Sequence, residues 1–164
     1  MLSNYKLEKY YILGNKKIKK SKFEPFDELA LDFLSDISKQ IFNSGKLKRY
    51  PDLISFAFWC RKKNLIKKKN LFNKNYIKKN LGIIYHVPPS NVPISLAYSF
   101  AFGLLSGNSN IVRVSNPDLE NIKELLKIIK TTIRKKIFSE IYKSNLFLSF
   151  KRDELISLDI SKKV

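Results

Sequence analysis

Two short polar segments of this 164-residue sequence contain the side chains best suited to binding a ligand. They are PPSNVP (Pro88–Pro93) and RVSNPD (Arg113–Asp118), and each lies at the end of a short apolar run. Neither contains a G-x-G-x-x-G or Walker pattern, so neither standard phosphate-binding loop is present. The sequence has one cysteine, Cys60, and one histidine, His86, which excludes a disulfide framework and a Cys/His zinc site. Both lie among apolar neighbours, which favours structural roles for them.

The elements that must position these segments alternate between strands and helices. The expected strands are 82–87, 110–114 and 146–150, and the expected helices are 94–106, 118–136 and one beginning near Arg152. Connections of helical length call for parallel strands in a sheet covered on both faces. Ligands bind beyond the carboxyl ends of the strands in such a sheet, and both polar segments fall there.

The first half of the sequence predicts helices of a different kind. Apolar residues recur every three or four positions between Pro25 and Asn43, which indicates an amphipathic helix. A second helix is expected from Pro51 to Asn64, followed by an Asn- and Lys-rich connector to residue 80, for which a partly helical structure stays open. Residues 1–24 are expected to be irregular or a paired extension. The predicted fold class is therefore α/β, with N-terminal helices followed by a β-α-β-α-β-α sheet that is incomplete.

The strongly basic composition permits several classes of function. The formal net charge is +18, and residues 61–80 carry nine positive charges and no acid. This pattern suits a nucleic-acid or anionic-membrane partner. However, 27 of the 32 basic residues are lysine, while base and phosphate recognition favours arginine. A solvated basic surface is the preferred interpretation, without a specific nucleic-acid partner.

Residues 81–110 contrast with this basic stretch, because they contain no Asp, Glu, Lys or Arg. Their longest apolar run, Ile94–Leu105, has 12 residues, and a membrane span needs about 20. A buried helix is expected instead, in which Gly103 allows close packing. No signal peptide is visible at the N-terminus, and a cytoplasmic location is expected.

The segment Gly82–Ser115, GIIYHVPPSNVPISLAYSFAFGLLSGNSNIVRVS, resembles the LuxC-type acyl-CoA reductases of bacterial bioluminescence. These fatty-acid reductases belong to the aldehyde dehydrogenase superfamily, and Tyr50–Asn64 is similar to a second stretch of the same family. The resemblance implies reduction of an acyl thioester to an aldehyde with NADPH. It also implies an acyl-CoA or acyl-carrier substrate and partner subunits that synthesise or transfer the acyl group.

The resemblance also implies roles for individual residues. Asn91 matches the superfamily asparagine whose amide helps to hold the carbonyl oxygen, a role suited to an NH₂ donor. Arg113 stands where the superfamily has a lysine at the adenosine ribose, and a guanidinium there favours the 2′-phosphate of NADPH. The other expected cofactor-binding residues are Pro88, Pro89, Ser90, Ser115 and Asn116.

The sequence departs from the family in its cysteine. The family's nucleophilic cysteine lies downstream of the matched region, whereas Cys60 matches no catalytic motif. The chain is therefore expected to be an N-terminal portion of the reductase, with a basic segment at 1–80 and the first part of the NADP-binding domain at 81–164. A non-catalytic relic or interaction subunit and a nucleic-acid-binding protein remain as alternatives.

Overall fold

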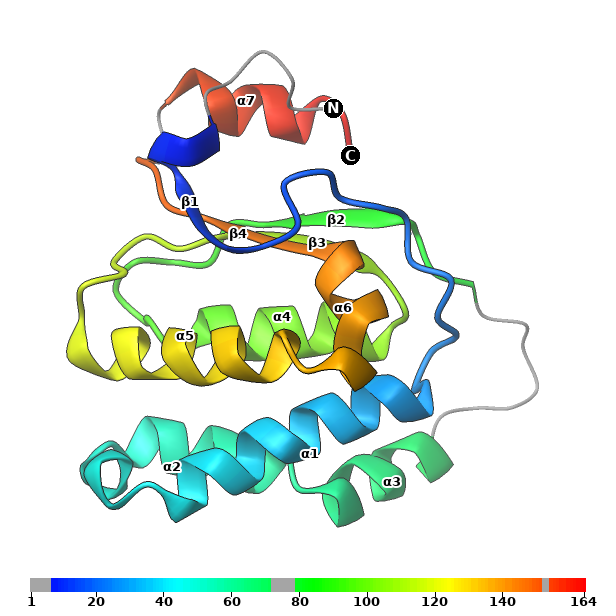
Figure 1. Ribbon diagram of the computed structural model, residues 1–164, viewed down its shortest axis with the longest axis vertical. Helices are drawn as coiled ribbons and strands as arrows, with labels where there is room; N and C mark the ends of the chain where they lie inside the picture. The colour runs from blue at the N-terminus through cyan, green and yellow to red at the C-terminus, as the bar shows by residue number, and fades with distance from the viewer. Residues whose placement is uncertain (1–6, 72–78, 152–153) are drawn as a thin grey trace.

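The sheet at the centre of the molecule has four strands in the order β1-β4-β3-β2 (Figure 1). The computed structural model describes residues 7–71, 79–151 and 154–164. Strands β2 (Ile83–His86), β3 (Ser109–Arg113) and β4 (Asn145–Leu148) are parallel, which confirms the α/β prediction. Strand β1 (Tyr11–Gly14) pairs antiparallel with β4, so the sheet is mixed and part of residues 1–24 is a paired extension.

Helices cover both faces of this sheet, and further helices form an additional layer (Figure 1). One face is covered by α4 (Ser95–Leu105) and α5 (Glu120–Ile133), with the short α6 (Ser139–Ser144) beside them. The opposite face is covered by α7 (Leu155–Ser161) and a 3₁₀ turn at Leu7–Lys9. The outer layer below α4 and α5 contains α1 (Glu28–Asn43), α2 (Pro51–Trp59) and α3 (Lys62–Leu71). Two more 3₁₀ turns lie at Gly45–Arg49 and Lys136–Phe138.

The outer layer differs from its prediction after α1. Helix α1 begins after Asp27, whose carboxylate accepts a hydrogen bond from the Leu29 amide at 2.8 Å, as an N-cap does. The single helix expected from Pro51 to Asn64 is two helices, because the chain turns at Cys60 and Arg61. The Asn64 side-chain amide donates to the Phe58 carbonyl at 2.7 Å across this turn. The expected connector is partly helical, because α3 extends into it as far as Leu71. Connector residues 72–78 lie outside the described residues.

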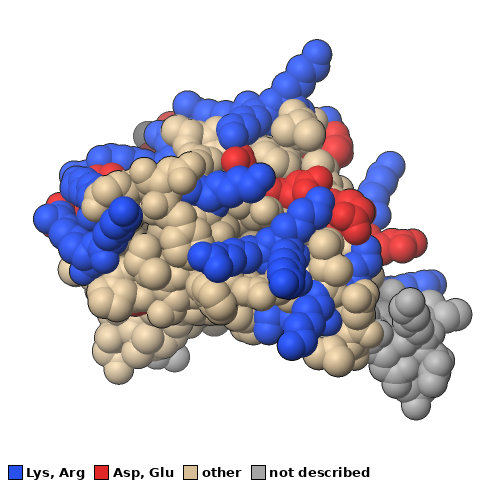
Figure 2. Space-filling view, turned by 90° about the horizontal axis from the view of Figure 1, so that it is seen from below, with Lys and Arg blue, Asp and Glu red and all other residues tan. Residues whose placement is uncertain are grey.

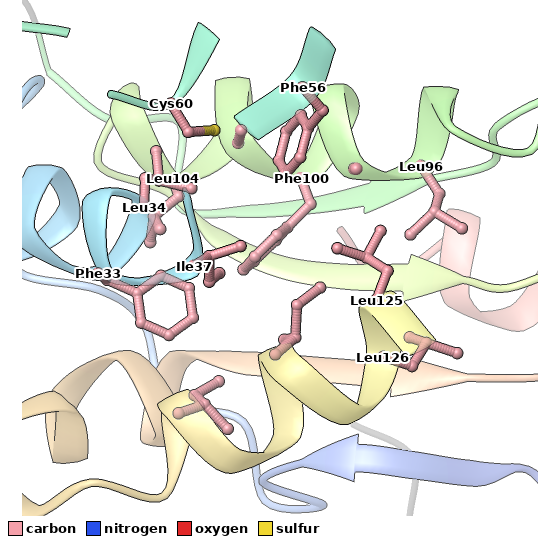
Figure 3. Packing of buried hydrophobic residues seen from close by; sticks show 14 of the residues in the cluster. Phe33, Leu34, Ile37, Phe56, Cys60, Leu96, Phe100, Leu104, Leu125 and Leu126 are labelled. Atoms are coloured by element: carbon pink, nitrogen blue, oxygen red, sulfur yellow. The ribbon is translucent and has the colours of Figure 1, made fainter. Parts of the chain in front are cut away.

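Two hydrophobic clusters pack against the two faces of the sheet. The larger cluster joins α1, α2, α4 and α5 to the sheet, and it includes Phe33, Phe56, Phe100 and Leu125 (Figure 3). The smaller cluster holds α7 on the other face through Ile156 and Ile160 of the helix. Residues from both halves of the chain therefore share one core, which fixes the sheet relative to the outer helices. The division at residue 80 stays a prediction.

No helix among the described residues has both the length and the apolar character that a membrane span requires.

Candidate functional site

A cleft of about 670 Å³ lies at the carboxyl ends of the three parallel strands. This volume falls within the range of about 300–1,000 Å³ usual for small-molecule sites. Three loops form the cleft, one after each strand. Its lining residues are Val87, Pro88, Pro89, Ser90, Arg113, Ser115, Asn116, Ser149, Phe150, Lys151 and Glu154. The six residues that the sequence predicted as cofactor-binding are thus brought together in one place.

Arg113 is the most unusual residue of this cleft, because its charged side chain is only 5% exposed. Two of its nitrogens donate to backbone carbonyls, Nη1 to Phe150 at 3.3 Å and Nη2 to Pro88 at 3.4 Å. Both bonds are longer than the usual N–H···O range of about 2.7–3.2 Å. The buried Nε has no hydrogen-bond partner, and no carboxylate of the described residues forms an ion pair with Arg113.

This arrangement leaves a buried positive charge with an unpartnered Nε in a residue that lines the cleft. A buried charge is costly unless it is paired and hydrogen-bonded. An anionic group in the cleft would satisfy the guanidinium of Arg113 in the bidentate way that phosphate and carboxylate oxygens allow. The donor set therefore suits a phosphate.

The polypeptide around Arg113 is held by contacts between and within the loops and between β2 and α7. The Asn116 side-chain amide donates to the Ser90 carbonyl at 3.3 Å, which joins the loop after β3 to the loop after β2. The third loop is held by Glu154, whose carboxylate accepts from the Lys151 amide at 2.9 Å just before α7. On the face covered by α7, the hydroxyls of Tyr85 and Ser157 lie 2.9 Å apart. These contacts pre-form the cleft around the guanidinium.

A buried polar network crosses the sheet beneath this site. His86 Nε2 lies 2.9 Å from Asn110 Oδ1, and His86 Nδ1 lies 2.7 Å from the Ser99 hydroxyl. Since Asn110 also donates through Nδ2 to Asn145 Oδ1 at 2.7 Å, its Oδ1 acts as the acceptor toward histidine. His86 Nε2 therefore carries a proton and donates it to Asn110 Oδ1. Burial lowers the pKa of His86, although the hydrogen bond to Asn110 acts in the opposite direction. His86 is buried and both of its ring nitrogens have protein partners, an arrangement typical of a structural histidine.

The structure places the remaining candidate residues outside the cleft. Asn91 is exposed on the turn that follows Ser90 and does not line the cleft. Cys60 is completely buried in the larger hydrophobic cluster, as predicted, and Figure 3 shows it among the apolar side chains there. Burial raises the pKa of its thiol, which disfavours the thiolate that a nucleophile requires. Among the described residues, no group of three or more His, Cys, Asp or Glu side chains could hold a metal ion.

Sequence reasoning missed the third loop of the site. Ser149, Phe150, Lys151 and Glu154 line the cleft, and none was a candidate. The available signal was their position after the third expected strand, because the carboxyl ends of parallel strands meet at one edge.

The fold and the cleft define an α/β protein that binds a ligand at the carboxyl edge of a parallel sheet. The family model described as "Acyl-CoA reductase (LuxC)" matches residues 35–141, about two thirds of the chain. The chain therefore belongs to the LuxC acyl-CoA reductase family, as the sequence resemblance indicated. This family implies an oxidoreductase-related function and a nicotinamide cofactor. Comparisons with curated proteins and with solved structures found no match.

Proposed function

We propose that this chain is the cofactor-binding part of a fatty acyl-CoA reductase and that its cleft binds NADPH. The observation that carries the proposal is the buried Arg113, which has an unpartnered Nε and lies on the wall of the cleft. A second cation, Lys151, and the hydroxyls of Ser90, Ser115 and Ser149 line the same cleft. These groups are donors that phosphate and ribose oxygens accept from.

The residues of the chain have separate tasks in this proposal. Arg113 holds the 2′-phosphate, and Ser115 and Asn116 hydrogen-bond to the same ribose or its phosphate. Pro88, Pro89 and Ser90 lie along the dinucleotide, and proline fixes φ and so limits the conformations of this loop. NADPH, when bound, supplies the hydride that reduces the acyl carbonyl carbon to the level of an aldehyde.

Asn91 is the proposed donor to the acyl carbonyl oxygen. It follows Ser90 directly and is exposed, so its amide is available to a substrate that approaches from outside the cleft. An amide N–H aimed at this oxygen stabilises the negative charge that develops there. Transfer of an acyl group through a thioester also needs a thiolate, and Cys60 is buried, so we assign no such role to it. The acyl donor, CoA or a carrier, and subunits that activate or transfer the acyl group remain proposed partners. The cytoplasmic location also remains a prediction.

The test of this proposal is the cofactor preference of an Arg113→Met variant. The affinities of the wild-type chain and the variant for NADPH and NADH are measured by calorimetry or nicotinamide fluorescence. Loss of a charged hydrogen-bond donor costs about 1.5–3 kcal/mol, so we expect NADPH to bind roughly 10- to 100-fold more weakly. NADH, which lacks the 2′-phosphate, should be affected much less.

Arg134→Met is the matched control, because Arg134 is an exposed arginine at the end of α5, outside the cleft. It should leave both affinities unchanged. Equal weakening of NADPH and NADH in Arg113→Met would remove Arg113 from the phosphate role. Failure of the wild-type chain to bind either cofactor would contradict the proposal as a whole.

A further inference from the structure

A basic surface lies at the amino edge of the parallel strands, at the opposite end of the sheet from the proposed cofactor cleft (Figure 1). Strand β1 ends there beside the start of β4, since Gly14 pairs with Leu146. Two hollows of about 300 and 240 Å³ adjoin at this edge and share Lys143 of α6. The amino-edge surface, as we call it, comprises Lys19, Lys20, Lys22, Arg134, Lys135, Lys136, Ile137 and Lys143.

The segment that follows β1 is held firmly against this edge. The Lys19 amide donates to the Lys143 carbonyl at 2.9 Å. The Ser21 amide donates to Ser109 Oγ at 2.6 Å, and this hydroxyl in turn donates to the Lys19 carbonyl at 2.8 Å. The side chains of Lys19, Lys20 and Lys22 are nevertheless exposed. The backbone therefore fixes the places of three neighbouring cations while their charged ends face solvent.

The positive charge of this surface is only partly neutralised. Of the described residues that line the two hollows, seven are Lys or Arg, and one, Glu140, is acidic. Lys143 pairs with Glu140 at 2.5 Å, and this hydrogen bond lowers the pKa of the carboxyl. The charges of Lys19 and Lys22 act in the same direction, so one carboxylate faces three lysines. One further cation pairs with an acid of α1, and the others form no ion pair with a described residue.

Apolar side chains lie among these cations. The hollow at the end of α5 is lined by Ile133 and Tyr142 together with four of the cations. Ile137, in the 3₁₀ turn between α5 and α6, directly follows Lys136 and is 65% exposed. Cations around an exposed apolar side chain are typical of a surface that lies on a bilayer. There the cations meet anionic headgroups, and the apolar side chain enters the boundary of the acyl chains.

Charge and apolar character together select the partner. A nucleic acid would neutralise the lysines through its phosphates, but these contacts would leave Ile137 in water. An anionic phospholipid offers both phosphate and hydrocarbon. We infer that the amino-edge surface binds a lipid bilayer that contains anionic phospholipids, with phosphate groups at Lys19, Lys20 and Lys22 and with Ile137 at the acyl boundary. This inference goes beyond the proposed function and does not depend on it.

The inference is tested by co-sedimentation of the chain with vesicles at physiological salt. Vesicles of phosphatidylglycerol and phosphatidylethanolamine are compared with vesicles of phosphatidylcholine alone, and only the anionic vesicles should bind the chain. The test variant replaces three lysines of the amino-edge surface: Lys19→Gln, Lys20→Gln and Lys22→Gln. Since one cation near an anionic membrane contributes roughly fivefold to binding, the three changes together should weaken it about 100-fold.

A second triple variant is the matched control, because it removes the same charge from the outer helical layer. It replaces three exposed lysines that also form no ion pair with a described residue: Lys48→Gln, Lys63→Gln and Lys67→Gln. This control should weaken vesicle binding much less, because its lysines lie away from the amino edge. Circular dichroism and NADPH affinity of each variant show whether the fold and the cleft are intact.

The apolar contribution is tested separately with Ile137→Ser. Loss of this side chain should weaken binding to anionic vesicles roughly tenfold, because a buried isoleucine is transferred out of water. Leu71→Ser is its control, since Leu71 is 77% exposed at the end of α3, outside the amino-edge surface. It should leave vesicle binding unchanged.

The other outcomes overturn the inference. If the wild-type chain fails to bind anionic vesicles, or if both triple variants lose binding equally, the amino-edge surface has no specific role at a bilayer. Unchanged vesicle binding of Ile137→Ser, or stronger binding of a DNA duplex than of vesicles to this surface, would exclude the bilayer as its partner. Vesicle binding that persists while NADPH fails to bind would refute only the proposed function, because the two sites lie at opposite ends of the sheet.

Discussion

Arg113 and His86 are both buried near the same end of the sheet, but they differ in how their polar atoms are paired. Both ring nitrogens of His86 have protein partners, whereas Arg113 keeps an unpartnered Nε and two long contacts. A fully paired buried group stabilises the fold, whereas an incompletely paired one requires a further explanation, which for Arg113 is the ligand proposed above. The sequence predicted both locations, His86 inside the first expected strand and Arg113 at the end of the second. It could not predict this difference, because the difference depends on which residues surround each side chain.

The pairing of His86 predicts a pH dependence of stability. Because burial lowers the pKa of His86 in the folded state, His86 binds a proton more readily in the unfolded chain than in the folded one. The contribution of neutral His86 is therefore fully present above the unfolded pKa of about 6.5 and is lost as pH falls toward the folded value. Urea unfolding between pH 7.5 and 5 should show this loss, with a slope of at most about 1.4 kcal/mol per pH unit for one proton.

A His86→Gln variant is the comparison for this experiment. Glutamine keeps an amide that can donate to Asn110, but it does not titrate in this range. The variant is expected to be less stable at pH 7.5 and to lose the part of the acid sensitivity that comes from His86. A slope identical to that of the wild-type chain would show that other groups cause the pH dependence.

At the scale of the elements, the three parallel strands and the helices between them were predictable, because their apolar runs and their Pro and Gly boundaries are local signals. For residues 1–24 the sequence left an irregular segment and a paired extension open, because strand β1 depends on pairing with β4 more than 130 residues later in the chain. The break between α2 and α3 was missed, because the sequence pattern of this stretch is helical throughout. The break is stabilised by the Asn64 side-chain amide, which donates a hydrogen bond to the Phe58 carbonyl. The alternation of strands and helices therefore predicted where the cleft lies, whereas the fourth strand of the sheet depends on long-range pairing.

Gly103 shows how closely α4 approaches the sheet. A Cβ at this position would lie 2.0 Å from Asn110 Oδ1 and 2.9 Å from the ring of His86. Gly103→Ala should therefore push α4 away from β2 and β3 and should disturb the His86–Asn110 hydrogen bond. Overpacking of this kind costs about 1–3 kcal/mol, which thermal or urea unfolding measures directly.

Gly45→Ala is the matched control for this substitution. No atom lies within 4 Å of a Cβ placed there, and the backbone of Gly45 does not have a positive φ. The change should alter the free energy of unfolding by less than about 0.5 kcal/mol. If Gly103→Ala were equally neutral, the close contact between α4 and the sheet would not contribute to stability.

At the scale of the whole molecule, the net charge of +18 lies mainly on the surface and away from the core and the cleft. Figure 2 shows the face formed by the α1–α3 layer, where basic side chains are spread out with uncharged surface between them. Several of these cations pair with acids, such as Lys62 with Asp32 at 2.5 Å and Lys69 with Glu28 at 2.8 Å. Exposed pairs of this kind contribute about 0–1 kcal/mol each, so they keep the surface solvated without determining the fold.

This distribution predicts that nucleic-acid binding by the chain is weak and sensitive to salt. Binding through exposed lysines releases counterions, and the affinity should fall by about a thousandfold or more between roughly 50 and 200 mM salt. Binding of NADPH should fall much less, because Arg113 is buried and is poorly screened by ions. Fluorescence anisotropy with a labelled 20-base-pair duplex, measured beside NADPH binding in the same buffers, separates the two effects. Duplex affinity that survives at 150 mM salt while NADPH fails to bind would reverse the assignment and make the basic surface the functional one.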